Sequence, residues 1–202
     1  MIARVRALRE EEIATAGQTL AAAFDADPLQ TFVFPDVEER ALRSPEQFAI
    51  LVRETFLFGE VFVTEDLGGI SAWYPPDVSI TAEKAKEAGY HRLPEVMGTE
   101  AFERLGGVLD YLSRTNEVGR PTACWYLAMI GVIPDRRGHG YGQALIAPIL
   151  SRADAAGVAI CLDTAQPRVK PLYERLGFKS AIETVDPRSG LRLWGYSRPP
   201  KS

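Results

Sequence analysis

The stretch "IGVIPDRRGHGYGQALIAPIL", residues 130–150, places a basic, glycine-rich loop between two apolar segments. Three glycines, at every second position from Gly138, follow directly behind Arg136 and Arg137. Glycine adopts positive φ and lets backbone N–H groups approach a ligand with no Cβ in the way. A loop of this kind that opens a helix binds anions, because its unpaired amides and the helix dipole favour negative charge. The stretch therefore predicts a strand, a phosphate-binding loop and a helix; a flexible basic turn is the alternative.

Length and composition are those of one globular domain. The chain has 202 residues, of which 46% are hydrophobic and 25% charged. The net charge of −4 argues against a general nucleic-acid binder, which relies on clustered positive charge. No stretch reaches the ~18 apolar residues of a membrane span, and the first residues lack the apolar core of a secretory signal. Cys124 and Cys161 each lie inside an apolar run, so we expect reduced thiols and a cytoplasmic protein. From the charge and the length of the apolar runs, we expect it to bind neither nucleic acid nor membrane.

The pattern of apolar residues predicts an α/β order with a helical insert at about residues 78–121, within a single domain spanning 1–202. The predicted strands are Ala3–Leu8, a hairpin over 61–74, a central strand over 123–133, residues 159–163, Lys179–Val185 and Leu191–Ser197. The predicted helices are Glu10–Phe24, Pro45–Gly59, Thr81–Gly89, Thr99–Glu117, a helix from the end of the glycine loop to about Ala156, and 171–176.

Two other glycine-loop chemistries fit the loop poorly. A P-loop requires a lysine and a hydroxyl residue after its last glycine, and here Gln143 and Ala144 follow Gly142. The dinucleotide fingerprint requires G-x-G-x-x-G and an acidic residue about 20 positions on. Asp163 satisfies the second condition, but the third glycine comes one place early and several strands precede the loop. A third chemistry, a coenzyme A loop, remains.

Two segments resemble the GNAT superfamily of acetyl-CoA-dependent N-acetyltransferases. Residues 137–142, RGHGYG, fit the superfamily signature [QR]-x-x-G-x-[GA] between a strand and a helix. Residues 162–178, LDTAQPRVKPLYERLGF, resemble its second landmark, in which the tyrosine is Tyr173. The resemblance implies a single-domain α/β fold: a mixed central sheet of about seven strands with flanking helices and a V-shaped splay at the acetyl-CoA site. The resemblance is weakest over residues 78–121.

The resemblance also implies roles for individual residues. Amides of the loop bind the pyrophosphate of acetyl-CoA, the end of the central strand pairs with the pantetheine arm, and Tyr173 is the general acid. Many relatives have asparagine where Val169 stands, so that polar contact to the cofactor arm is either missing or supplied by Arg168 or Gln166. The residues implied to bind the cofactor are Ile130, Gly131, Val132, Arg137, Gly138, His139, Gly140, Tyr141, Gly142 and Arg168.

The acceptor side is less defined. Asp25 and Asp27, after the first helix, are candidates to attract a cationic amine, or else they only solvate the helix end. Trp73, Tyr74 and Trp125 are candidates for an aromatic slot, with core packing as the alternative. His91 and His139 are too isolated for a metal site, so no metal is expected. The central strand contains no acid between residues 125 and 132, which favours an amine of low pKa, about 7.7–8, over a lysine side chain near ~10.4.

The sequence thus predicts an acetyl-CoA-dependent N-acetyltransferase that acts on a primary amine of a small molecule. Within the superfamily, the resemblance is strongest to members that act on aminonucleoside-type antibiotics, so it implies such an antibiotic or a related metabolite as the substrate. A protein N-terminal or lysine acetyltransferase on the same scaffold is one alternative, and a non-catalytic CoA-binding module is another. A monomer and a homodimer are both compatible with the sequence.

Overall fold

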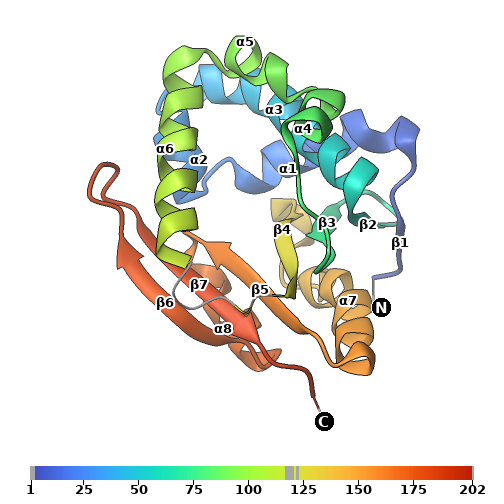
Figure 1. The fold of residues 1–202 in the computed structure, drawn as a ribbon. Coiled ribbons are helices and arrows are strands. Elements are labelled where there is room, and N and C mark those ends of the chain that lie inside the picture. Colours follow the sequence, from blue (N-terminus) through green and yellow to red (C-terminus); the bar gives the residue numbers. More distant parts are fainter. Residues whose placement is uncertain (1–2, 117–120, 122, 202) are drawn as a thin grey trace.

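The structure, a computed structural model, describes residues 3–116, 121 and 123–201. Within them, seven strands form one sheet in the order β1-β2-β3-β4-β5-β7-β6 (Figure 1). Its strands are β1 Val5–Ala7, β2 Glu60–Thr64, β3 Gly69–Tyr74, β4 Cys124–Val132, β5 Ala159–Thr164, β6 Lys179–Val185 and β7 Arg192–Arg198. The helices are α1 Ile13–Phe24, α2 Pro28–Val33, α3 Val37–Phe58, α4 Ala82–Ala88, α5 Leu93–Met97, α6 Thr99–Asn116, α7 Tyr141–Ala156 and α8 Lys170–Arg175. Short 3₁₀ turns are η1 Glu10–Glu12, η2 Tyr90–Arg92, η3 Pro134–Arg136 and η4 Pro167–Val169.

The sheet is mixed, and β4 lies at its centre. β4 and β5 pair in parallel, whereas the other neighbouring strands pair antiparallel. Successive strand residues face opposite sides of a sheet, and β3 shows this alternation. Ile70 and Ala72 pack into a cluster with α1 and α3, whereas Trp73 packs into a second cluster with α7 and α8. Helices therefore cover both faces of the sheet, as Figure 1 shows for α1, α3 and α7 around β3 and β4.

These findings confirm the predicted fold class and the central position of the strand before the glycine loop. Two helices differ from the prediction. α2 was not predicted; Asp27 caps it and Pro28 occupies its first turn, where a missing N–H costs nothing. α3 begins at Val37 instead of Pro45, because the Asp36 carboxylate accepts a 2.7 Å hydrogen bond from the Glu39 N–H and the helix continues through Pro45. The helix predicted over 99–117 ends at Asn116, and residue 117 lies outside the described residues.

The insert is helical as predicted and consists of α4, α5 and α6. The insert connects α3 to β6. Arg43 of α3 donates to the Val96 carbonyl of α5 at 2.8 Å, and the Tyr111 hydroxyl of α6 lies 2.6 Å from the Thr184 hydroxyl of β6. Among the described residues, no helix has the length and apolar character needed to cross a membrane.

A buried arginine fixes the last strand to the rest of the domain. Arg198 is 2% exposed, and its guanidinium binds both Asp154 carboxylate oxygens of α7, at 2.7 and 2.8 Å. Its Nε donates to the Leu176 carbonyl at 2.9 Å. This fork–fork ion pair joins β7, α7 and the end of α8, so it holds in place the two helices that carry the predicted site.

We expect Arg198→Met to lower the free energy of unfolding by about 2–4 kcal/mol, because the substitution leaves the partly buried Asp154 carboxylate and the Leu176 carbonyl without their hydrogen-bond donor. Urea unfolding measures the change, with Arg192→Met, which removes an exposed pair with Glu183, as a control that costs under about 0.5 kcal/mol. The Arg198 bonds lower the pKa of Asp154 to about 2. The difference in the free energy of unfolding between wild type and Arg198→Met is therefore at its full value above about pH 4, and it decreases as the pH falls toward 2. Equal stability of both proteins at pH 7 would contradict this assignment.

Candidate active site

The sheet opens between its two central strands. β4 pairs with β5 only from Cys124 to Leu127, opposite Ala159–Leu162. Beyond that point β5 pairs with β7 alone, whereas β4 continues beside β3 to Val132. Ala72 lies opposite Met129 and Trp73 opposite Leu127, so β4 contains one extra residue there, a β-bulge that turns the strand away from β5. The edge of β4 over residues 128–132 is thus free on the β5 side, which is the splay that the resemblance implies.

The glycine loop follows the free edge directly. Gly138 and Gly140 have φ of 78° and 80°, and a Cβ at either position would meet no atom within 4 Å. Gly140 precedes the first turn of α7 and supplies no side-chain cap. In the part of the chain that the structure describes, the N–H groups of residues 141–143 have no hydrogen-bond acceptor. Open space, positive φ and uncapped amides at the start of a 16-residue helix fit a pyrophosphate.

The side chains of the loop are already engaged. The Arg137 guanidinium donates to the carbonyls of Val132 at 3.1 Å and Ala23 at 2.8 Å, so it fastens the end of α1 to the end of β4. Arg136 donates to the Asp66 carboxylate at 2.9 Å. His139 is exposed, with Nδ1 2.8 Å from the Arg137 carbonyl. The loop therefore offers its amides to a ligand, and its arginines hold the surrounding elements.

The end of β4 is packed tightly against α1. A Cβ at Gly131 would lie 2.8 Å from the Cβ of Ala23 and 2.9 Å from Cδ2 of Leu20. Ile130 faces the other side and packs against the cluster of α7 and α8. Gly131 is thus required for close helix packing, and only the backbone of these residues borders the splay.

Tyr173 of α8 packs into the same cluster as Ile130 and is 3% exposed. Its ring lies 5.7 Å from that of Phe178 and 5.8 Å from that of Tyr196, measured between centroids. Burial, followed by the negative charge of Asp27, raises the pKa of Tyr173 above its ordinary value. Among the described residues its hydroxyl has no hydrogen-bond partner. The hydroxyl is therefore protonated at neutral pH and available as a donor.

Asp27 lies where α1 gives way to α2. Its carboxylate caps α2 by accepting from the Leu29 N–H at 2.9 Å. Burial raises its pKa, against the opposing effects of hydrogen bonds from the Leu29 and Gln30 amides and the charge of Arg168. The charge of Asp27 affects the pKa of Tyr173, and that of Arg168 affects the pKa of Asp27, so the α1–α2 connection lies near η4 and α8. The Arg168 side chain is exposed and donates to Gln166 at 3.3 Å.

The other candidates for the acceptor site have contacts of their own. Asp25 forms an ion pair with the buried Arg40, at 3.1 Å. Trp73 has no exposed surface and belongs to the core, which is the packing role left open by the sequence. The guanidinium of Arg152 lies 5.4 Å above the Trp125 ring, and Tyr74 donates to Glu54 of α3. Trp73 and Trp125 thus share the apolar cluster of Tyr173, and of the two acidic candidates Asp27 is the one whose charge affects Tyr173.

Two carboxylates near the site were not identified from the sequence. Glu54 is 3% exposed and accepts from Tyr74, and burial raises its pKa. An acid on the otherwise apolar face of the predicted helix was the available signal. Asp66 binds Arg136 and the Tyr141 hydroxyl, each at 2.9 Å. Its position in a hairpin turn does not indicate these two contacts, because Arg136 and Tyr141 lie 70 and 75 residues away.

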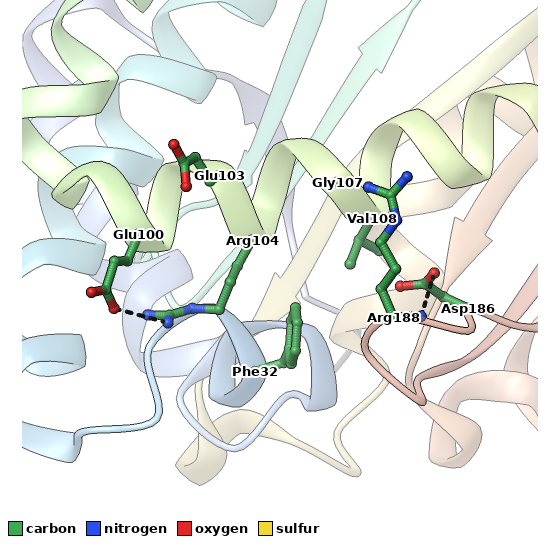
Figure 2. A pocket seen from close by; sticks show the side chains of 8 residues that line it. All are labelled: Phe32, Glu100, Glu103, Arg104, Gly107, Val108, Asp186 and Arg188. Atoms are coloured by element: carbon green, nitrogen blue, oxygen red, sulfur yellow. Dashed lines mark hydrogen bonds and ion pairs between the residues drawn. The ribbon is translucent and has the colours of Figure 1, made fainter.

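A cavity of about 340 Å³ lies between α2, α6 and the β6–β7 turn (Figure 2). Arg104 pairs with Glu100 there, and the Asp186 carboxylate accepts from the Arg188 N–H within the turn. The cavity is lined by Phe32, Glu100, Glu103, Arg104, Gly107, Val108, Asp186 and Arg188. None of the predicted cofactor or acceptor residues is among them. No group of three or more potential metal ligands occurs among the described residues.

Comparison with known proteins agrees with this geometry. Residues 95–180 match a family model described as an acetyltransferase (GNAT) domain. The fold is similar to that of "histone acetyltransferase HPA2 and related acetyltransferase" from Corynebacterium glutamicum, with TM-score 0.71, 20% identity, and coverage of 100% of this chain and 98% of that one. It is also similar to arylalkylamine N-acetyltransferase 2 from Aedes aegypti, with TM-score 0.70, 16% identity, and coverage of 98% and 99%. An agmatine N-acetyltransferase variant has TM-score 0.61, 17% identity, and coverage of 97% and 98%.

The chain therefore has the GNAT fold, and residues 95–180 match the model of a GNAT acetyltransferase domain. GNAT acetyltransferases use acetyl-CoA as co-substrate. The splayed sheet and the uncapped loop are the features of this chain that fit that molecule.

Proposed function

We propose that the protein transfers the acetyl group of acetyl-CoA to a primary amine of a small molecule. The observation that supports the proposal most is the free edge of β4. Ile130 of this strand packs against the cluster that contains Tyr173, and the strand leads into the uncapped amides at the start of α7. This arrangement provides a place for the thioester beside β4, a place for its phosphates at the start of α7, and a proton donor in the cluster against which Ile130 packs. A protein that only binds CoA, the non-catalytic alternative, would not require the buried hydroxyl of Tyr173.

The cofactor side of the site consists mainly of backbone. Acetyl-CoA supplies the activated acetyl group as a thioester. The amides of residues 137–142 bind its pyrophosphate, and the free edge over Ile130–Val132 pairs with its extended arm as an added strand. An N–H of this edge polarises the acetyl carbonyl. Arg168, on the exposed start of η4, contacts the arm from the other side of the splay.

The acceptor side requires a group that receives a proton and a group that donates one. Between residues 125 and 132 β4 contains no acid, so Asp27 is the carboxylate that draws in the ammonium form of the amine and accepts its proton. The amine nitrogen then bonds to the acetyl carbon as the carbon–sulfur bond breaks. Tyr173 donates its hydroxyl proton toward the departing sulfur, and the second proton, which the nitrogen loses as the amide forms, restores the Tyr173 hydroxyl. The products are the acetylated amine and the CoA thiol, and the proton on Asp27 passes to solvent.

We expect Asp27→Asn to raise KM for the amine about tenfold or more and to shift the activity profile toward higher pH, because neutral amine must then arrive from solution. Asparagine caps a helix as well as aspartate does, so stability changes little. Steady-state kinetics at several pH values measures the effect. An unchanged KM and pH profile would remove Asp27 from the acceptor site.

The proposed acceptor class is an aminonucleoside-type antibiotic or a related amine. In order along the chain, residues 19–28, 61–77, 124–142 and 155–178 resemble puromycin N-acetyltransferase, which supports this class. The names of two similar structures, an arylalkylamine and an agmatine N-acetyltransferase, also support a small amine. Acetylation of such an antibiotic in the cytoplasm would confer resistance.

A thiol-release assay tests the proposal, with acetyl-CoA and a panel containing puromycin, arylalkylamines, agmatine and a peptide with a free N-terminus and a lysine. We expect release of CoA with small amines and none with the peptide. Acetylation of the peptide alone would instead favour the protein acetyltransferase.

A further inference from the structure

The turn between β2 and β3 contacts both ends of the glycine loop, although it lies about 70 residues earlier in the chain. One oxygen of Asp66, Oδ2, accepts from Arg136 Nε at 2.9 Å and from the Tyr141 hydroxyl at 2.9 Å. Arg136 precedes the loop glycines, and Tyr141 lies between Gly140 and Gly142. A single carboxylate oxygen therefore joins residues 136 and 141, which enclose most of the amides proposed to bind pyrophosphate.

The turn itself is held rigidly. The second oxygen of Asp66, Oδ1, accepts from the Thr64 hydroxyl at 2.8 Å and from the Gly68 N–H at 3.1 Å. Leu67 is the one non-glycine residue with positive φ, 54°, in the described chain, a conformation that persists only where its surroundings impose it. Its carbonyl accepts from the Thr19 hydroxyl of α1 at 2.9 Å. The Asp66 carboxylate thus has a fixed position from which to hold the loop.

A backbone contact joins the same two segments. The Ile133 N–H donates to the Gly68 carbonyl at 3.0 Å, immediately before η3. A Cβ at Gly68 would lie 3.0 Å from Cγ of Arg136, so the turn and the arginine stem are in close contact. The entry to the loop is thereby fixed by backbone and side chain together, whereas its exit into α7 depends on the Tyr141 hydroxyl.

We propose that Asp66 is a positioning residue that holds the loop over 136–141 in the shape whose amides bind the pyrophosphate of acetyl-CoA. This inference rests on the proposed function. Asp66 does not touch the ligand; it acts through Arg136 and Tyr141. It also holds the Arg136 charge at the turn, which leaves the phosphates to the amides.

A purely structural role for this ion pair has a different consequence. The side chains of Arg136 and Asp66 are 48% and 38% exposed, and pairs this exposed contribute little to stability. Loss of the pair should therefore leave the fold intact. A large change confined to ligands that carry the pyrophosphate would separate positioning from structural support.

The test compares two acetyl donors, acetyl-CoA and S-acetylpantetheine, which lacks the pyrophosphate. We expect Asp66→Asn to lower kcat/KM for acetyl-CoA at least about tenfold, through KM, and to change kcat/KM for S-acetylpantetheine less than about twofold. Calorimetry with CoA should show the same tenfold loss of affinity. Glu60→Gln is the matched control, since it removes an ion pair between β2 and Arg152 of α7 away from the loop; its CoA affinity should equal that of wild type.

Unchanged or tighter CoA binding by folded Asp66→Asn would overturn the inference, as would an equal loss with both donors. Tyr141→Phe removes a single hydroxyl and serves if Asp66→Asn does not fold; we expect about a threefold loss of CoA affinity, and no loss would count against the inference. Wild-type protein that fails to bind CoA would refute the proposed function itself, which is a separate outcome.

Discussion

Tyr173→Phe is expected to lower turnover at least about tenfold while the affinity for acetyl-CoA remains nearly unchanged, because the substitution removes only the proton donor. The hydroxyl lies on a buried ring, and burial together with Asp27 raises its pKa, so it stays protonated throughout the range of an assay. A CoA thiol has a pKa near ~8.5, so the hydroxyl acts first as a hydrogen-bond donor to the charge that develops on sulfur. Single-turnover kinetics with a fixed amine measures the loss.

Tyr196→Phe is the matched control for this substitution. Tyr196 is 2% exposed and packs against Tyr173 in the same cluster, so the control removes a similar hydroxyl at the same depth. Its turnover should match that of wild type. If both variants lose activity equally, the effect comes from packing, and full activity of Tyr173→Phe would exclude Tyr173 as the donor.

Gly140→Val is expected to weaken acetyl-CoA binding at least about tenfold without unfolding the protein. A Cβ at this position meets no neighbour within 4 Å, so no steric clash disturbs the fold. The φ of 80° is unfavourable for a β-branched residue, and the loop must change its backbone to relieve the strain. The amides that open α7 then lose their common direction. Calorimetric titration of CoA measures the change.

Gly157→Val provides the comparison at the other end of the same helix. Gly157 has φ of 65°, and a Cβ there also meets no atom within 4 Å. The two substitutions thus impose the same kind of strain on α7, but only one lies in the proposed ligand loop. Equal CoA affinity in the two variants would contradict the loop assignment.

Features that depend on local sequence were predictable. The central strand, the loop and the second landmark are continuous segments, and apolar periodicity with glycine caps located most elements within a few residues. α2 was missed because "DADP" indicates a helix end, whereas Asp27 ends one helix and caps the next. The start of α3 was predicted too late, at Pro45, because proline is common in the first turn of a helix. The actual cap, Asp36, lies nine residues earlier.

Features that depend on distant contacts were not predictable. The basic pair before the glycines appeared ready to bind phosphate, yet Arg136 binds Asp66 and Arg137 binds the end of α1. Asp25 and Asp27 were equivalent candidates in the sequence, and only the fold pairs Asp25 with Arg40 and places Asp27 where its charge affects Tyr173. Partner choice of this kind depends on which elements meet in space, which a single sequence does not encode locally.

Calorimetric titration of acetyl-CoA into the wild-type protein, beside a nicotinamide dinucleotide control, tests the central claim most directly. We predict saturable binding of acetyl-CoA at one site and no binding of the dinucleotide. A folded sample that binds neither ligand, or binds the dinucleotide instead, would contradict the assignment of the glycine loop and with it the proposed acetyl transfer.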